Sequence, residues 1–164
     1  MDSKILIRFE LPSAVNEGRP PADPAKLLRY EFRLVFSGRV AIWVGGEENI
    51  ILDDSPLIGT LLDLQDGLLR LQSSTSPTIA SDDYGEYSMT FRRARRLIEF
   101  ETNYGGGKRS IFRASADDFR TAVAKFGNDL LSSIEEKFPG ILENPHYPWL
   151  RDLILCWEDR FSGI

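Results

Sequence analysis

Acidic and basic side chains are the residues of this sequence best suited to chemistry, and they are segregated along the chain. Residues 47–86 carry nine Asp or Glu and one Arg, for a net charge of −8, whereas residues 87–120 carry eight Lys or Arg and four acids, for +4. The whole chain has a net charge of −5. Because surface fields steer encounters and repel like-charged molecules, this pattern favours a protein that binds a charged partner.

The acidic segment supplies the candidate partner-binding residues. Its carboxylates would attract a basic protein, in an association that weakens as salt screens the charges. One aromatic residue of the segment, Tyr84, would serve as an anchor, because tyrosine is enriched at binding hot spots. The residues that we expect to contact the partner are Glu47, Glu48, Asp53, Asp54, Asp82, Asp83, Tyr84 and Glu86.

A basic run, Arg92-Arg93-Ala94-Arg95-Arg96, falls on a predicted strand, tight turn and strand. Its ordinary interpretation is a solvated hairpin tip, and the alternative is a contact for phosphate or for an acidic surface. The acidity of the whole chain and the lack of a recognisable reading helix argue against direct binding of nucleic acid.

Motifs for catalysis or metal binding are not recognisable. The single histidine, His146, has no marked nucleophile or second ligand beside it and is expected to be a surface or capping residue. The single cysteine, Cys156, adjoins the apolar face of a predicted helix, which favours a buried, inert thiol. The glycine-rich stretch at 105–110 lacks the spacing of a phosphate-binding loop. We therefore expect a protein that is not an enzyme and that holds no cofactor or metal ion.

Length and composition fit a single globular domain spanning residues 1–164, with 42% hydrophobic and 27% charged residues. No apolar run approaches the roughly 18 residues that cross a bilayer, and the first residues lack a secretory signal. One cysteine cannot form an internal disulfide, which agrees with a reducing compartment. We expect a cytoplasmic protein that does not contact the membrane, and the oligomeric state stays open.

The hydrophobic periodicity predicts an α+β fold. Alternation of apolar and polar residues indicates strands, and apolar residues recurring every three or four positions indicate helices. The expected architecture is a mainly antiparallel sheet of about six or seven strands with helices packed on one face, although two three-stranded units could also pack as two sheets. The expected strands are 4–10, 29–36, 39–44, 49–52, 85–92, 95–102 and 108–114. The expected helices are 57–71, 116–137 and 150–161, the last within a helical tail at 141–164.

Local signals mark several boundaries of these elements. Four prolines at 12–24 exclude a helix or a central strand from the 11–28 connection. Gly45-Gly46 permits the positive φ values of a tight turn. Ser55 and Ser115 are expected to cap the first and second helices, and Phe138-Pro139-Gly140 is expected to end the second. Residues 72–84 are rich in Ser, Thr and Asp and are interpreted as a loop.

The order of elements, and the phrases FRLVFSGRVAIWV and FRASADDFRTAVAKFGNDLL, resemble small bacterial α+β domains, some of which are immunity proteins of polymorphic toxin systems. The likeness covers most of the chain in architecture and carries no diagnostic motif, so it transfers no functional residue. It implies a cytosolic binding protein that neutralises a cognate toxin, often a nuclease, by occupying its active site. A nuclease has a basic substrate groove, which the −8 segment would complement.

A second function remains open from the sequence. A small-ligand-binding protein or enzyme could hold its ligand in a pocket between the sheet and the helix at 149–161. Trp157 or His146 would then line the cavity. The lack of a nucleophile, a histidine pair or a cofactor loop favours protein binding.

Overall fold

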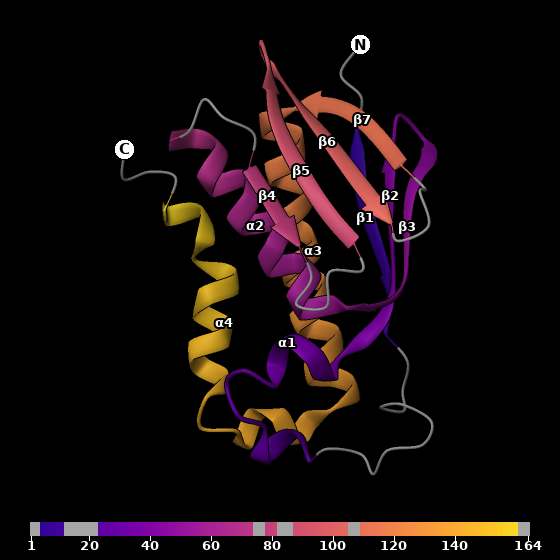
Figure 1. The fold of residues 1–164 in the computed structure, drawn as a ribbon. Helices are drawn as coiled ribbons and strands as arrows, with labels where there is room; N and C mark the ends of the chain where they lie inside the picture. Colours follow the sequence, from indigo (N-terminus) through magenta and orange to yellow (C-terminus); the bar gives the residue numbers. More distant parts are fainter. Residues whose placement is uncertain (1–3, 12–22, 74–77, 82–86, 105–108, 161–164) are drawn as a thin grey trace.

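The computed structural model describes residues 4–11, 23–73, 78–81, 87–104 and 109–160 (Figure 1). The α+β class is confirmed, but the expected single sheet is wrong. The described strands form a three-stranded antiparallel sheet in the order β1-β2-β3 and a four-stranded antiparallel sheet in the order β4-β5-β6-β7. The two sheets approach each other where β3 meets β7.

The first sheet consists of β1 (Ile5–Glu10), β2 (Ser37–Val44) and β3 (Glu47–Pro56). Their inner side chains, which include Ile7, Ile42 and Ile50, are buried in the core. The turn between β2 and β3 is the predicted one, with φ of 63° at Gly45 and 89° at Gly46. Strand β3 is longer than the predicted 49–52.

Residues 29–36 do not form the predicted strand. They contain α1 (Phe32–Val35), a single helical turn, which places Phe32 and Phe36 on one face. Both rings are buried, whereas Tyr30 is 66% exposed. The predicted hairpin would pair residues 29–36 with β2, but both edges of β2 are already paired, with β1 and with β3. A helical turn forms its hydrogen bonds internally, so it buries the two phenylalanine rings without pairing with a strand edge.

The second sheet consists of β4 (Thr78–Ser81), β5 (Tyr87–Ala94), β6 (Leu97–Tyr104) and β7 (Arg109–Ser115). The meander β5-β6-β7 was predicted, whereas β4 lies in the predicted loop. Sequence alternation is weak in β4 because its four residues, Thr-Ile-Ala-Ser, contain one large apolar side chain. Its backbone pairs in antiparallel register with the edge of β5, the next strand along the chain.

Aromatic rings join the second sheet to the long helix. Phe91, Phe100 and Phe112 face one another across three strands, with adjacent ring centroids 4.9 and 5.1 Å apart. The ring of Phe119 contacts all three, at centroid distances of 5.4 to 6.0 Å. Phe119 lies on α3 (Ala116–Lys137), whose N-terminus is capped as predicted by Ser115, which accepts a hydrogen bond from Asp118 N at 3.1 Å.

The two long helices share one core with both sheets. Helix α2 (Leu57–Ser73) packs against β2, β3, β4 and β5, and α3 packs against β1 and β7 and against α2. Helix α2 begins at the predicted Leu57, but the prediction that Ser55 caps it is wrong. Ser55 and Pro56 end β3, and the Ser55 hydroxyl forms a hydrogen bond with Thr60 Oγ1 at 2.5 Å. Helix α3 ends at Lys137, with Phe138 as the C-cap residue, which agrees with the predicted stop at Phe138-Pro139-Gly140.

The predicted C-terminal helix is divided. It forms α4 (Tyr147–Leu155) and a 3-10 turn, η3 (Trp157–Arg160). Cys156 is exposed between them, so the expected burial of its thiol is wrong. The reason is that α4 ends at Leu155, after which the turn directs Trp157 into the core, where it is 1% exposed. In the part of the chain described here, no helix combines the length and the apolar character that crossing a membrane requires.

Two further 3-10 turns, η1 (Pro24–Lys26) and η2 (Pro139–Glu143), lie against each other beneath α1 and α4 (Figure 1). The buried side chain of Asn144 connects them. Its Nδ2 donates to the carbonyl oxygens of Pro24 and Leu27 at 2.8 and 2.9 Å, and its Oδ1 accepts from His146 N at 2.8 Å. His146 is the N-cap residue of α4, without a side-chain capping bond.

Candidate functional site

Four of the predicted partner-binding residues lie on β3. Glu47, Glu48, Asp53 and Asp54 are all exposed, and β3 is the last strand of the first sheet. The other four, Asp82, Asp83, Tyr84 and Glu86, lie outside the described residues.

Irregularities in β3 decide which of its acids come together. Asp53 follows Glu48 by five positions, an odd offset, so a regular strand would place the two residues on opposite faces. The pairing of β2 with β3 shifts between Ile42 and Trp43, which places Asn49 as an extra residue and restores Glu48 to the outer face. A second shift occurs opposite Arg39, where Asp54 has a φ of 52°.

Arg39 of β2 gathers the acids of this outer face. Its guanidinium lies 3.3 Å from Asp53, 3.8 Å from Glu48 and 3.8 Å from Glu10 of β1. This role of Arg39 could not be predicted from the sequence, because the three acids belong to different parts of two strands. Arg39 therefore reduces the negative potential of the face, while the carboxylates remain accessible.

The same face carries Trp43, an aromatic residue that was not among the predicted partner-binding residues. Trp43 pairs with Glu48 across the strands, and the guanidinium of Arg8 lies over its ring at 5.1 Å. The Nε1 atom of Trp43 is buried, with no hydrogen-bond partner among the described residues. Ile51, 38% exposed, follows on β3. Arg39 and Trp43 alternate with the buried residues Val40 and Ile42, and this alternation was the sequence signal that Trp43 lies on the outer face.

The basic run does not form one patch. Arg92 lies on the outer face of the second sheet, where its Nη1 donates to Glu101 Oε2 at 2.7 Å. Beside it, Arg113 donates to Glu99 at 2.8 and 2.9 Å, and this hydrogen bond lowers the pKa of the Glu99 carboxyl below its ordinary value of 4.5. Arg92 is therefore largely neutralised by strand acids.

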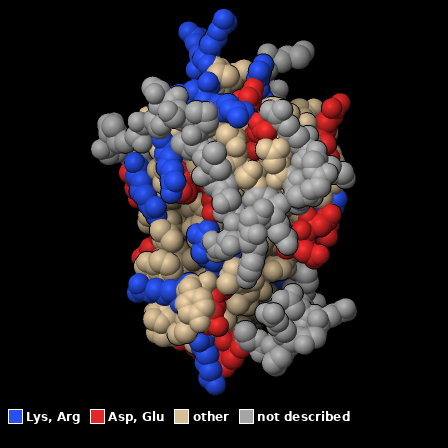
Figure 2. Space-filling model, viewed as in Figure 1, with Lys and Arg blue, Asp and Glu red and all other residues tan. Residues whose placement is uncertain are grey.

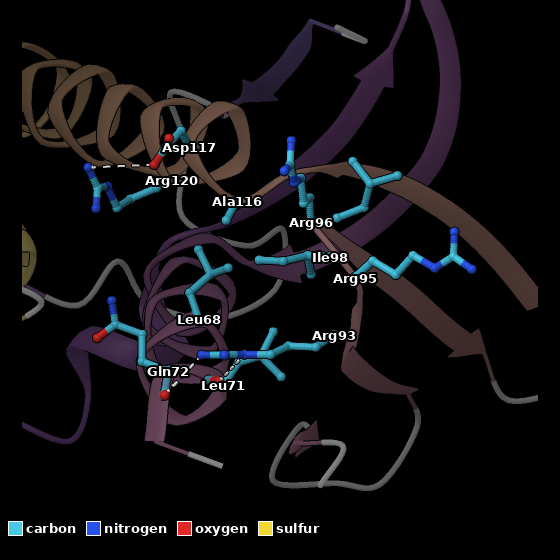
Figure 3. Close-up of a pocket in the computed structure, with 11 residues that line it drawn as sticks. Leu68, Leu71, Gln72, Arg93, Arg95, Arg96, Ile98, Ala116, Asp117 and Arg120 are labelled. Carbon is cyan, nitrogen blue, oxygen red and sulfur yellow. Dashed lines mark hydrogen bonds and ion pairs between the residues drawn. The ribbon is translucent and has the colours of Figure 1, made fainter. Parts of the chain in front are cut away.

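The other arginines of the run line a pocket of about 320 Å³ (Figure 3). This pocket lies between the C-terminal end of α2, the β5–β6 hairpin and the first turn of α3. Figure 2 shows Lys and Arg side chains gathered at the top of the molecule, where β5 and β6 turn. The residues that line the pocket are Leu68, Leu71, Gln72, Arg93, Arg95, Arg96, Leu97, Ile98, Ala116, Asp117 and Arg120.

One wall of the pocket is fixed by hydrogen bonds. Arg93 Nε donates to Leu71 O and Arg93 Nη2 to Gln72 O, both at 2.9 Å (Figure 3). These carbonyl oxygens belong to the last turn of α2, whose negative end favours a cation. Arg120 on the opposite side lies 3.9 Å from Asp117 and 3.5 Å from Glu158.

The pocket differs from the one considered as the alternative from the sequence. It is not lined by His146 or Trp157, and Trp157 is part of the core cluster. Among the described residues, no three His, Cys, Asp or Glu side chains lie close enough together to hold a metal ion.

Comparison with known proteins gives no match: no family model, no curated protein and no solved structure is detectably similar to this chain. The functional argument therefore depends on the chain's own residues.

Proposed function

We propose that this protein is a non-catalytic protein-binding module that acts as an immunity protein and neutralises a cognate bacterial toxin. Its binding surface includes the acidic outer face of the first sheet. Asp82, Asp83, Tyr84 and Glu86, which lie outside the described residues, are proposed to contact the same partner. The observation that carries the proposal is the placement of Glu48 and Asp53 on one exposed face by the irregularities of β3, beside Glu47 and Asp54.

The internal ion pairs of this face are weak enough to be exchanged for a partner's cations. The Arg39 side chain is 39% exposed, and its contacts with Glu48 and Asp53 are 3.8 and 3.3 Å long. Exposed pairs of this kind contribute about 0–1 kcal/mol. A basic partner would supply several cationic groups at once. Its ion pairs with Glu48 and Asp53 would replace the weak ones with Arg39, which would favour association.

Apolar groups on the same face would supply contact area. Trp43 and Ile51 lie among the charged residues, and tryptophan is one of the residues enriched at binding hot spots. A toxin nuclease fits this surface, because its substrate groove is basic and binding there would block its active site.

The test is affinity purification of the tagged protein from its native cells at low and at high salt. We expect a stoichiometric basic protein at low salt that is lost at high salt. The variants Glu48→Lys/Asp53→Lys and Asp82→Lys/Asp83→Lys should each lose it. Glu136→Lys/Glu143→Lys makes the same change in net charge at exposed positions on α3 and η2, and this control should retain the partner.

Two outcomes would contradict the proposal. Recovery of the protein alone at both salt concentrations would argue against a protein partner. Equal partner retention by Glu48→Lys/Asp53→Lys, Asp82→Lys/Asp83→Lys and the control would place the binding surface elsewhere.

A further inference from the structure

The pocket at the start of α3 combines an apolar floor with a cationic rim. Its floor is formed by Leu68, Leu71 and Ile98, which are 3%, 3% and 6% exposed. Figure 3 shows Leu68 and Ile98 directed toward each other between α2 and β6. Such a floor can bury the hydrocarbon part of a ligand.

The rim carries an excess of positive charge in an acidic protein. Four arginines and one aspartate line the pocket, whereas the chain as a whole has a net charge of −5. Arg95 and Arg96 are exposed at the turn of the β5–β6 hairpin, where Arg95 has a φ of 61°. In Figure 3, Arg96 extends beside the start of α3, and Arg95 extends away from Leu68 and Leu71.

One arginine of the pocket is held in place. Arg93 uses two of its five N–H donors on the carbonyl oxygens of Leu71 and Gln72, which orients its guanidinium above the floor. A fixed guanidinium loses less conformational entropy when it binds an anion than a freely rotating one. The first turn of α3 adds the positive end of its dipole at Ala116.

We propose that this pocket binds a small organic anion, with its phosphate or carboxylate group held by the arginines and a compact apolar body on the leucine and isoleucine floor. The volume of about 320 Å³ is at the lower end of small-molecule sites, which accommodates a body of about one aromatic ring. Guanidinium groups match phosphate and carboxylate with paired hydrogen bonds. This site is separate from the acidic face, so it does not depend on the proposed toxin partner.

The probe for this site is phenyl phosphate, which contains both halves of the ligand. Inorganic phosphate and phenol are the two half-ligand controls. By titration calorimetry, phenyl phosphate should bind at least about tenfold more tightly than either, because each control lacks one set of contacts. Benzoate distinguishes the head groups: tighter binding of benzoate than of phenyl phosphate would assign a carboxylate ligand.

Methyl NMR locates the bound probe. Phenyl phosphate should shift the methyl resonances of Leu68, Leu71 and Ile98, which line the pocket, and leave those of Ile5 and Ile7 in the first sheet unchanged. Shifts confined to methyl groups outside the pocket would overturn the proposal.

Charge variants test the rim. Arg95→Gln/Arg96→Gln should weaken phenyl phosphate binding at least about tenfold, whereas Asp117→Asn, which removes the one acid of the lining, should strengthen it. Arg29→Gln/Arg113→Gln is the matched control, because both residues are exposed and neither lines the pocket. Absence of saturable binding to the wild type, or equal weakening by the two double variants, would overturn the proposal.

Discussion

The ring of Phe91 lies against Gly67, so closely that a Cβ atom added at residue 67 would stand 2.2 Å from Phe91 Cε2. Gly67 occupies the interior of α2, where glycine costs about 1 kcal/mol relative to alanine. The contact explains why a glycine is suited to this position. It allows α2 to approach β5 and lets Phe91 pack fully buried against Phe100 and Phe119.

Replacing this glycine should destabilise the protein, although alanine is the better helix former. We expect Gly67→Ala to lower the free energy of unfolding by about 1–3 kcal/mol, because Phe91 is confined by other rings and cannot move away. Denaturant unfolding measures the change. Gly140→Ala is the control, since a Cβ there meets no atom within 4 Å, and it should stay within about 0.5 kcal/mol of the wild type. A Gly67→Ala variant as stable as the wild type would contradict this packing.

Asn144 should contribute strongly to the stability of the region where residues 24–27 pack beside the start of α4. It is 2% exposed and makes three hydrogen bonds that connect residues 24–27 with the start of α4. Asn144→Ala should cost about 2–4 kcal/mol of unfolding free energy, because the loss leaves buried backbone groups without partners. Asn128→Ala provides the comparison. Asn128 is exposed and bonds only Ala124 O among the contacts described, so its loss should cost less than about 1 kcal/mol.

The alkaline stability should depend on Tyr147. Burial raises the pKa of its phenol above the ordinary value of 10.0, and the hydrogen bond to Glu135 Oε1 at 2.7 Å raises it further. A group whose pKa is higher in the folded state contributes its full stability below the unfolded pKa and loses it as the pH rises through the folded value. We therefore expect the unfolding free energy to fall above about pH 10, as the unfolded tyrosine ionises.

Tyr147→Phe tests this dependence. At neutral pH, the free energy of unfolding of the variant should be about 1 kcal/mol lower than that of the wild type, because the hydrogen bond to Glu135 is lost. Above pH 10, the free energy of unfolding should fall less steeply in the variant than in the wild type. Urea unfolding at a series of pH values gives both quantities. Tyr30→Phe alters a 66% exposed ring and should retain the wild-type profile. If the free energy of unfolding falls equally with pH in the wild type and in Tyr147→Phe, the alkaline loss of stability does not come from Tyr147.

The acid stability should depend in part on Glu99. The hydrogen bond from Arg113 is the main cause of its lowered pKa, so Arg113→Gln should shift that pKa upward toward 4.5. A lowered folded pKa contributes stability above the unfolded value, which is lost as the pH falls through the folded one. The stability of Arg113→Gln should therefore depend less on pH below about 4.5. Carboxyl NMR titration measures the Glu99 pKa directly, and an unchanged value in Arg113→Gln would refute this.

Several features follow from short stretches of sequence, because neighbouring residues determine them. The β5-β6-β7 meander has a period-2 pattern and turns of its own. The Ser115 cap and the aspartates after it fix the start of α3. The Gly45-Gly46 turn needs positive φ at both positions, which glycine adopts without steric cost. These predictions are independent of the rest of the chain.

Tertiary structure decided the features that depend on segments distant in sequence. Residues 29–36 have the alternation of a strand and still form α1, because both edges of β2 are occupied. Arg39 brings together Glu10, Glu48 and Asp53 only because β1 and β3 flank β2 and the register between β2 and β3 is shifted. The cationic pocket combines residues 68–72, 93–98 and 116–120, which no spacing in the sequence connects. The periodicity of the sequence determines which face of a helix or strand is apolar. Which other elements that face packs against depends on which strand edges are already paired and how much space the core leaves.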